Sequence, residues 1–85
     1  MTLPVTLAGL KKGLRATIER VEHRDENDLI SRRLRHLGFV PGEEVVMITH
    51  GPLGMDPVLI QIGFTRFALR REEAGRVHVT EVSSI

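Results

Sequence analysis

The chain has 85 residues, of which 41% are hydrophobic and 27% are charged, and its formal net charge is +1. These values are typical of an ordinary globular protein and far from those of disordered, fibrous or membrane chains. The chain has no cysteine, which excludes disulfides and thiolate metal sites and favours a reducing cytoplasm. The first ten residues lack the pattern of a signal peptide. We therefore expect one cytoplasmic domain, residues 1–85, with a single thin core.

The first elements are predicted as a helical turn and a strand. Residues 6–10 begin with a cap-forming threonine and hold two leucines one turn apart, which predicts a single helical turn. Residues 14–21 alternate apolar and polar side chains, the period of a half-buried strand, but Val21 falls out of phase. A bulge near Arg20 would restore the alternation.

Residues 24–38 are predicted to form a helix, because acidic side chains crowd its start and basic ones crowd its end. The charged residues are Asp25, Glu26 and Asp28 at the start, and Arg32, Arg33, Arg35 and His36 at the end. Gly38 then supplies a left-handed C-cap. Pro41 and Gly42 follow with the chemistry of a type II turn.

Short strands are predicted after the helix, at residues 43–49, 57–62, 67–70 and 76–82, with turns at 51–54, 63–66 and 71–75. Residues 83–85 are expected to be a frayed tail. The fold class is therefore mainly β: a small closed or nearly closed barrel of about five strands, with one helix after the first strand.

Catalytic and metal chemistry find no support in the sequence. The four histidines stand 13 or more residues apart, and no cysteine can complete a tetrahedral site. The serines lack a nucleophile-elbow pattern, and no glycine-rich phosphate loop is present. We expect no enzymatic activity, no metal and no cofactor.

Nucleic acid is not expected as a partner either. Small barrels that bind it present aromatic platforms, whereas this chain has no Trp or Tyr and only Phe39, Phe64 and Phe67. Alternation places Phe67 in the core. The same shortage argues against capture of proline-rich peptides.

Arg33 is the ambiguous residue of the helix. On a helical wheel it falls within the apolar arc of Leu29, Ile30, Leu34 and Leu37. Its stem could therefore lie on the core with the guanidinium paired to Glu72 or Glu73, or it could contact a partner. Arg32 and Arg35 fall on the opposite, solvent-facing side.

Three segments carry a resemblance to a known family: RLRHLGFVPG at 33–42, GPLGMDPVLIQIG at 51–63 and FALRREEAGRVHV at 67–79. With Leu7, Leu10 and Gly13, they resemble the FeoA family of bacterial ferrous iron uptake across nearly the whole chain. The resemblance implies an SH3-like barrel with a helix inserted after the first strand. It also implies an accessory or regulatory role beside FeoB, a membrane permease with a cytosolic GTP-binding domain. Met55 and residues 63–66 depart from the family pattern.

The predicted function is to bind the cytosolic part of a FeoB-like permease, so that the chain meets the membrane only through this partner. A homo-oligomer is left open. The expected contact surface combines the exposed helix side with the loop Gly51 to Asp56, through Arg32, Arg35, His36, Pro52, Leu53, Met55 and Asp56. Gly38, Pro41 and Gly42 are expected to be structural.

Two alternatives remain open. A similar barrel forms the C-terminal domain of iron-dependent repressors, which suggests a nucleic-acid-binding or repressor-associated module, although 85 residues leave no room for a helix-turn-helix. The other alternative is a GTPase activator of FeoB that donates an arginine, with Arg66 and Arg71 as candidates.

Overall fold

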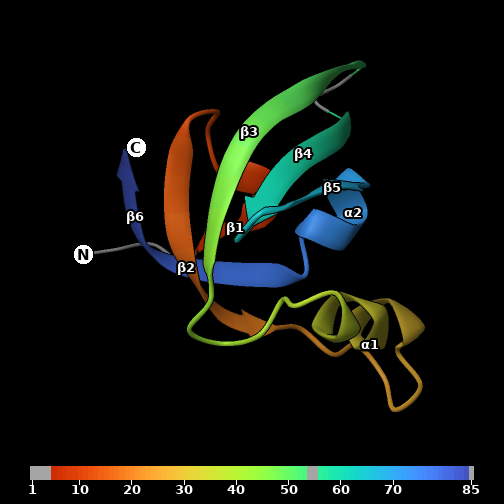
Figure 1. Ribbon diagram of the computed structural model, residues 1–85. Coiled ribbons are helices and arrows are strands. Elements are labelled where there is room, and N and C mark those ends of the chain that lie inside the picture. The colour runs from red at the N-terminus through yellow and green to blue at the C-terminus, as the bar shows by residue number, and fades with distance from the viewer. Residues whose placement is uncertain (1–4, 54–55, 85) are drawn as a thin grey trace.

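The computed structural model describes residues 5–53 and 56–84. In this part of the chain, six strands form one antiparallel sheet that curls into an unclosed barrel, in the order β1-β6-β2-β3-β4-β5 (Figure 1). The strands are β1 (Val5–Thr6), β2 (Leu14–Val21), β3 (Glu44–Leu53), β4 (Asp56–Ile62), β5 (Thr65–Leu69) and β6 (Val77–Ser84). The mainly β class is confirmed. The strand beyond the expected five is the two-residue β1, which pairs with β6.

Three short helices connect the strands: the 3-10 helix η1 (Leu7–Gly9), α1 (Leu29–His36) and α2 (Arg71–Ala74). η1 confirms the predicted helical turn, and α1 follows the first long strand as expected. None of the helices in the described residues is long and apolar enough to span a membrane.

The pairing of β2 with β6 contains the predicted bulge, because the register shifts between Ile18 and Arg20. A second shift follows on β6, where Glu81 adopts a φ of 54°. The expectation of a frayed tail is wrong for Ser83 and Ser84, since both pair with the start of β2. Ile85 lies outside the described residues.

α1 is shorter than predicted, and the reason is the side chain of Asp28. Asp28 is the N-cap, with an extended backbone, and its carboxylate accepts the Ser31 N–H at 3.0 Å. The residues before it form a turn in which Asp25 Oδ1 accepts the Asn27 N–H at 2.9 Å. Asp25 and Glu26 therefore lie outside the helix, and the expected acidic first turn is wrong.

The end of α1 agrees with the sequence prediction. Gly38 has a φ of 110°, which lets the Phe39 N–H reach the Leu34 carbonyl at 3.0 Å. In the following turn Gly42 has a φ of 93°, and the Glu43 N–H donates to the Val40 carbonyl at 3.1 Å. These values fit the predicted left-handed C-cap and type II turn.

α2 was expected to be part of a turn at 71–75, and a carboxylate explains why a helical turn forms instead. Glu73 Oε1 accepts the Arg70 N–H at 2.9 Å, so the side chain of the third helical residue satisfies the N-cap amide. Asp56 Oδ1 accepts the Arg71 N–H at 3.0 Å and holds the helix start against β4.

The β3–β4 hairpin is longer than the predicted strands, because β3 runs on to Leu53 and β4 begins at Asp56. Gly51 is therefore part of a strand and not of a loop. A Cβ at Gly51 would lie 2.6 Å from the Asp56 carbonyl oxygen, so this close approach of the two strands requires glycine.

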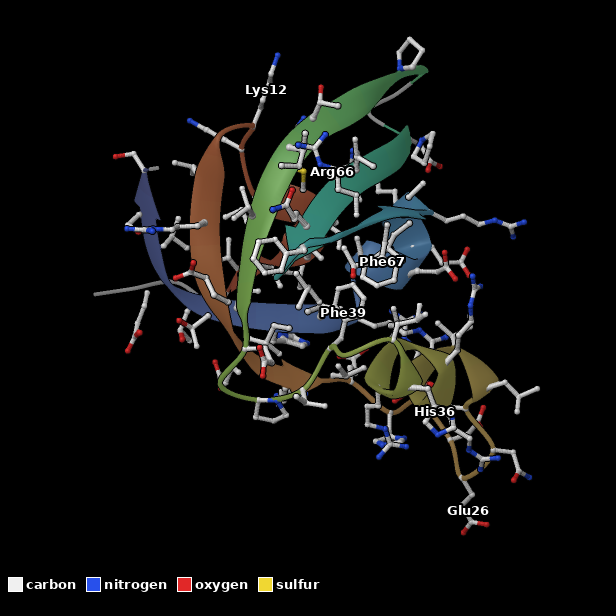
Figure 2. The ribbon with its side chains drawn as sticks, in the orientation of Figure 1. Lys12, Glu26, His36, Phe39, Arg66 and Phe67 are labelled. Carbon is white, nitrogen blue, oxygen red and sulfur yellow. The ribbon has the colours of Figure 1, made fainter. Side chains whose placement is uncertain are left out.

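The barrel interior and the inner side of α1 share one hydrophobic core. Within the described residues, it consists of Leu7, Leu10, Ala16, Ile18, Leu34, Phe39, Val45, Met47, Val58, Ile60, Leu69, Ala74, Val77 and Val79. Phe39 and Phe67 point toward each other (Figure 2), with ring centroids 5.7 Å apart. Phe67 is half-buried and packs against the core from β5. Leu29, by contrast, is 69% exposed.

Replacing Phe39 by alanine is expected to destabilise the protein by about 3–5 kcal/mol. The reason is that the ring is fully buried and joins the segment after α1 to β5 through its contact with Phe67. Urea unfolding followed by circular dichroism measures this loss. The matched control is Phe64→Ala, whose ring is fully exposed and whose removal should change stability by less than about 0.5 kcal/mol. Equal losses in the two variants would contradict the assignment of Phe39 to the core.

Candidate functional site

A buried ion pair fixes the position of α1. The Asp28 carboxylate pairs with Arg76, which immediately precedes β6, and both residues are buried. Asp28 Oδ2 also accepts the Arg24 N–H at 2.9 Å. One side chain thus caps the helix, closes the preceding turn and ties both to the sheet.

These contacts act on the acidity of Asp28. The hydrogen bond from the Ser31 N–H, helped by that from Arg24 and by the Arg76 guanidinium, lowers the pKa of Asp28 from 3.8 to about 2, against the opposing effect of burial. The pKa of Glu22 is also lowered, by hydrogen bonds from Arg24 and His78. Both carboxylates lie beside the chain segment that leads into α1.

The outer side of α1 carries the basic residues predicted to contact a partner. Arg32, Arg35 and His36 are all exposed, and Figure 2 shows His36 on α1 away from the strands. They form a basic surface near the negative end of the helix dipole. The arrangement can attract an acidic partner.

The loop half of the predicted surface lies elsewhere. The β3–β4 hairpin is at the opposite end of the barrel from α1 (Figure 1). β3 has ten residues, which span about 33 Å at the usual rise of a strand. Pro52 and Asp56 are exposed there, Leu53 pairs with Asp56, and Met55 lies outside the described residues. The structure therefore does not bring the two halves together.

Arg33 is paired as the structural interpretation expected, and the partner is Glu73. Its Nη1 lies 3.4 Å from Glu73 Oε2, whereas the side chain of Arg33 remains 67% exposed. The expected packing of its stem on the core is therefore limited, and most of its donors face solvent. Arg33 is both a link between α1 and α2 and an accessible cation.

A shallow pocket of about 390 Å³ lies between α1, β5 and α2, and sequence reasoning did not find it. It is lined by Ile30, Arg33, Ala68, Arg70, Glu72 and Glu73. The sequence predicts a turn at 71–75 and allows a pair between Arg33 and Glu72 or Glu73, but it predicts no cavity beside them. The folded chain places residues 70–73 together with Ile30 and Arg33 around one cavity.

The remaining candidates for binding chemistry are largely used within the fold. His50 Nε2 lies 3.1 Å from the Leu10 carbonyl, and His78 Nε2 lies 3.3 Å from Glu22 Oε1. Among residues 5–53 and 56–84, no three His, Asp or Glu side chains gather as a metal site would require. Of the phenylalanines, Phe39 is buried and Phe67 half-buried, which leaves Phe64 as the exposed ring. One ring is not a platform for stacked bases.

The fold is that of an SH3-like domain, as in a solved prokaryotic SH3 domain protein with which it shares a TM-score of 0.87. The FeoA domain model matches residues 5–81. The chain belongs to the FeoA family, which is associated with ferrous iron transport.

Two relatives are informative. The FeoA of Stenotrophomonas maltophilia, a prokaryotic SH3 domain protein solved in complex with zinc, is 50% identical, with a TM-score of 0.87 over 94% of this chain and 96% of that one. A fusion of Fe(2+) transport protein A with the Fe(2+) transporter FeoB from Porphyromonas gingivalis is 36% identical over 78 residues. The match covers 92% of this chain but 9% of the fusion protein.

A similar fold occurs in structures of a manganese-dependent transcriptional repressor and in IdeR. IdeR from T. acidophilum is 21% identical, with a TM-score of 0.73 over 94% of this chain and 35% of that one. At this identity the likeness concerns the fold alone.

The contribution of the Asp28 carboxylate can be tested through pH. Because the pKa of Asp28 is lowered in the folded state, its contribution to stability is present above pH 4 and is lost as the pH falls toward about 2. Asp28→Asn retains a cap acceptor but loses the charge that faces Arg76. The variant should be less stable at pH 7, and the difference from the original chain should shrink between pH 5 and pH 2.

Unfolding in urea at each pH measures this difference, and Asp25→Asn serves as the control because it leaves the Asp28 carboxylate intact. A constant gap between the Asp28→Asn variant and the original chain across this range would show that the charge of Asp28 does not stabilise the fold.

Proposed function

We propose that this chain is a cytoplasmic accessory protein of ferrous iron uptake that acts as a single, non-catalytic domain by binding the cytosolic part of a FeoB-like permease. The observation that carries the proposal is the fusion protein of P. gingivalis, in which a related sequence and FeoB occupy one polypeptide. Such a fusion is favoured when two domains work in contact, since a tether raises their effective concentration.

The basic side of α1 is the half of the predicted surface that we favour for this contact. Arg32, Arg35 and His36 are exposed on a helix that the Asp28–Arg76 pair holds to the barrel. A rigid, exposed cationic surface binds an acidic partner without first having to be ordered. The hairpin half, with Pro52, Leu53, Met55 and Asp56, is a separate candidate surface.

The proposal is tested by measuring the affinity of the chain for the purified cytosolic part of the FeoB from the same genome, by isothermal titration calorimetry. We expect saturable binding that weakens with salt. Arg32→Glu combined with Arg35→Glu should weaken it at least tenfold, whereas Lys12→Glu, on the turn before β2, should not.

Pro52→Asp tests the hairpin surface in the same assay. A loss with Pro52→Asp alone would transfer the contact to the hairpin, and no binding by the original chain would reject the proposed function. GTP hydrolysis by the cytosolic part is followed in parallel. An accelerated rate that is lost with Arg66→Ala would replace the non-catalytic role by that of a GTPase activator.

A further inference from the structure

The pocket between α1, β5 and α2 combines aliphatic side chains with charges of both signs, since Arg33, Arg70, Glu72 and Glu73 all line it. Both oxygens of Glu73 are engaged, Oε1 by the Arg70 N–H at 2.9 Å and Oε2 by Arg33 Nη1 at 3.4 Å. The side chain of Arg33 is 67% exposed, and Arg70 is exposed. Ile30 supplies an apolar wall. The guanidinium donors that face solvent here suit a carboxylate.

The exposed side of β5 leads into this pocket. Arg66, Ala68 and Arg70 are exposed, and they alternate with the half-buried Phe67 and the buried Leu69. Figure 2 shows Arg66 and Phe67 leaving β5 on opposite sides. Arg70 keeps an extended backbone, so the alternation continues beyond the strand. Ala68 and Arg70 also line the pocket, which makes strand and pocket one continuous surface.

The position of β5 in the sheet favours an extended ligand. β5 is the last strand in the sheet order, so in the described chain one of its edges has no strand partner. Arg66 and Arg70 are four residues apart, about 13 Å in an extended chain. In an extended ligand segment, two carboxylates four residues apart lie on the same side of the chain, with the same spacing as Arg66 and Arg70. The residue midway between them would face Ala68 and the pocket.

We propose that the pocket and the exposed side of β5 form a binding site for an extended acidic segment of a protein partner. Carboxylates of the segment pair with Arg66 and Arg70, and an aliphatic residue between them enters the pocket against Ile30. Arg66 already donates its Nε to Gln61 Oε1 at 2.9 Å, which orients its other donors without consuming them. The inference rests on the proposed function only in that the permease would supply the segment.

The test is a titration of the ¹⁵N-labelled full chain with the peptide acetyl-Gly-Glu-Ser-Leu-Ser-Glu-Gly-amide, followed by amide chemical shifts at low and high salt. We expect shifts at residues 30, 33 and 66–70 that diminish with salt. Arg66→Glu combined with Arg70→Glu should reduce them at least fivefold, and a peptide with lysines in place of the glutamates should bind this variant instead. Lys12→Glu should leave the original response unchanged.

Arg66→Gln combined with Arg70→Gln is the milder variant, to be used if charge reversal perturbs the fold. The inference is overturned if the shifts map elsewhere, if a scrambled peptide of equal charge binds as well, or if the arginine variants still respond. Calorimetry with the FeoB cytosolic part separates the two proposals. Unchanged FeoB binding by the double variant rejects only the inferred site, whereas peptide binding without FeoB binding rejects only the proposed function.

Discussion

The arrangement of this small domain depends on the carboxylate of Asp28. It caps α1 through the Ser31 N–H, closes the preceding turn through the Arg24 N–H and pairs with the buried Arg76. Each contact alone is ordinary, but all three converge on one side chain whose pKa burial by itself would raise. A buried guanidinium without this partner would be strongly unfavourable. The ion pair therefore fixes the position of α1 relative to the sheet, in addition to stabilising the helix itself.

The candidate surfaces follow from that placement. Because α1 is anchored at its N-cap, its inner side delivers Leu34 to the core and the segment after the helix delivers Phe39, while the arginines of its outer side stay in solvent. The same anchoring brings Ile30 and Arg33 to the charged residues of α2 and creates the pocket beside β5. A scaffold with few aromatic residues and no metal cluster among its described residues thus presents charged side chains, several of them arginines, for recognition.

Much of the fold could be predicted from local patterns, whereas the site could be predicted only in part. The alternation of apolar and polar residues predicts the strands. The positive φ angles that Gly38 and Gly42 readily adopt predict the end of α1 and the turn after it. Charge pattern alone misplaced the helix start, because whether an acidic residue sits in a helix or caps it depends on its hydrogen bonds. The pocket and the separation of α1 from the β3–β4 hairpin arise from contacts between distant segments, which spacing along the chain does not encode.

The route of the chain between β2 and β3 has an evolutionary consequence. These strands pair directly, Ala16 with Val45, and the Gly42 N–H and the Glu43 carbonyl both bond to Ile18 at 2.8 Å. The chain segment that contains α1 therefore leaves the sheet and returns to it at the same place. Insertions or deletions within it need not shift the register of any strand pair. The length of this segment can thus change without altering the strand pairing of the barrel, provided that Asp28, Leu34 and Phe39 keep their buried contacts.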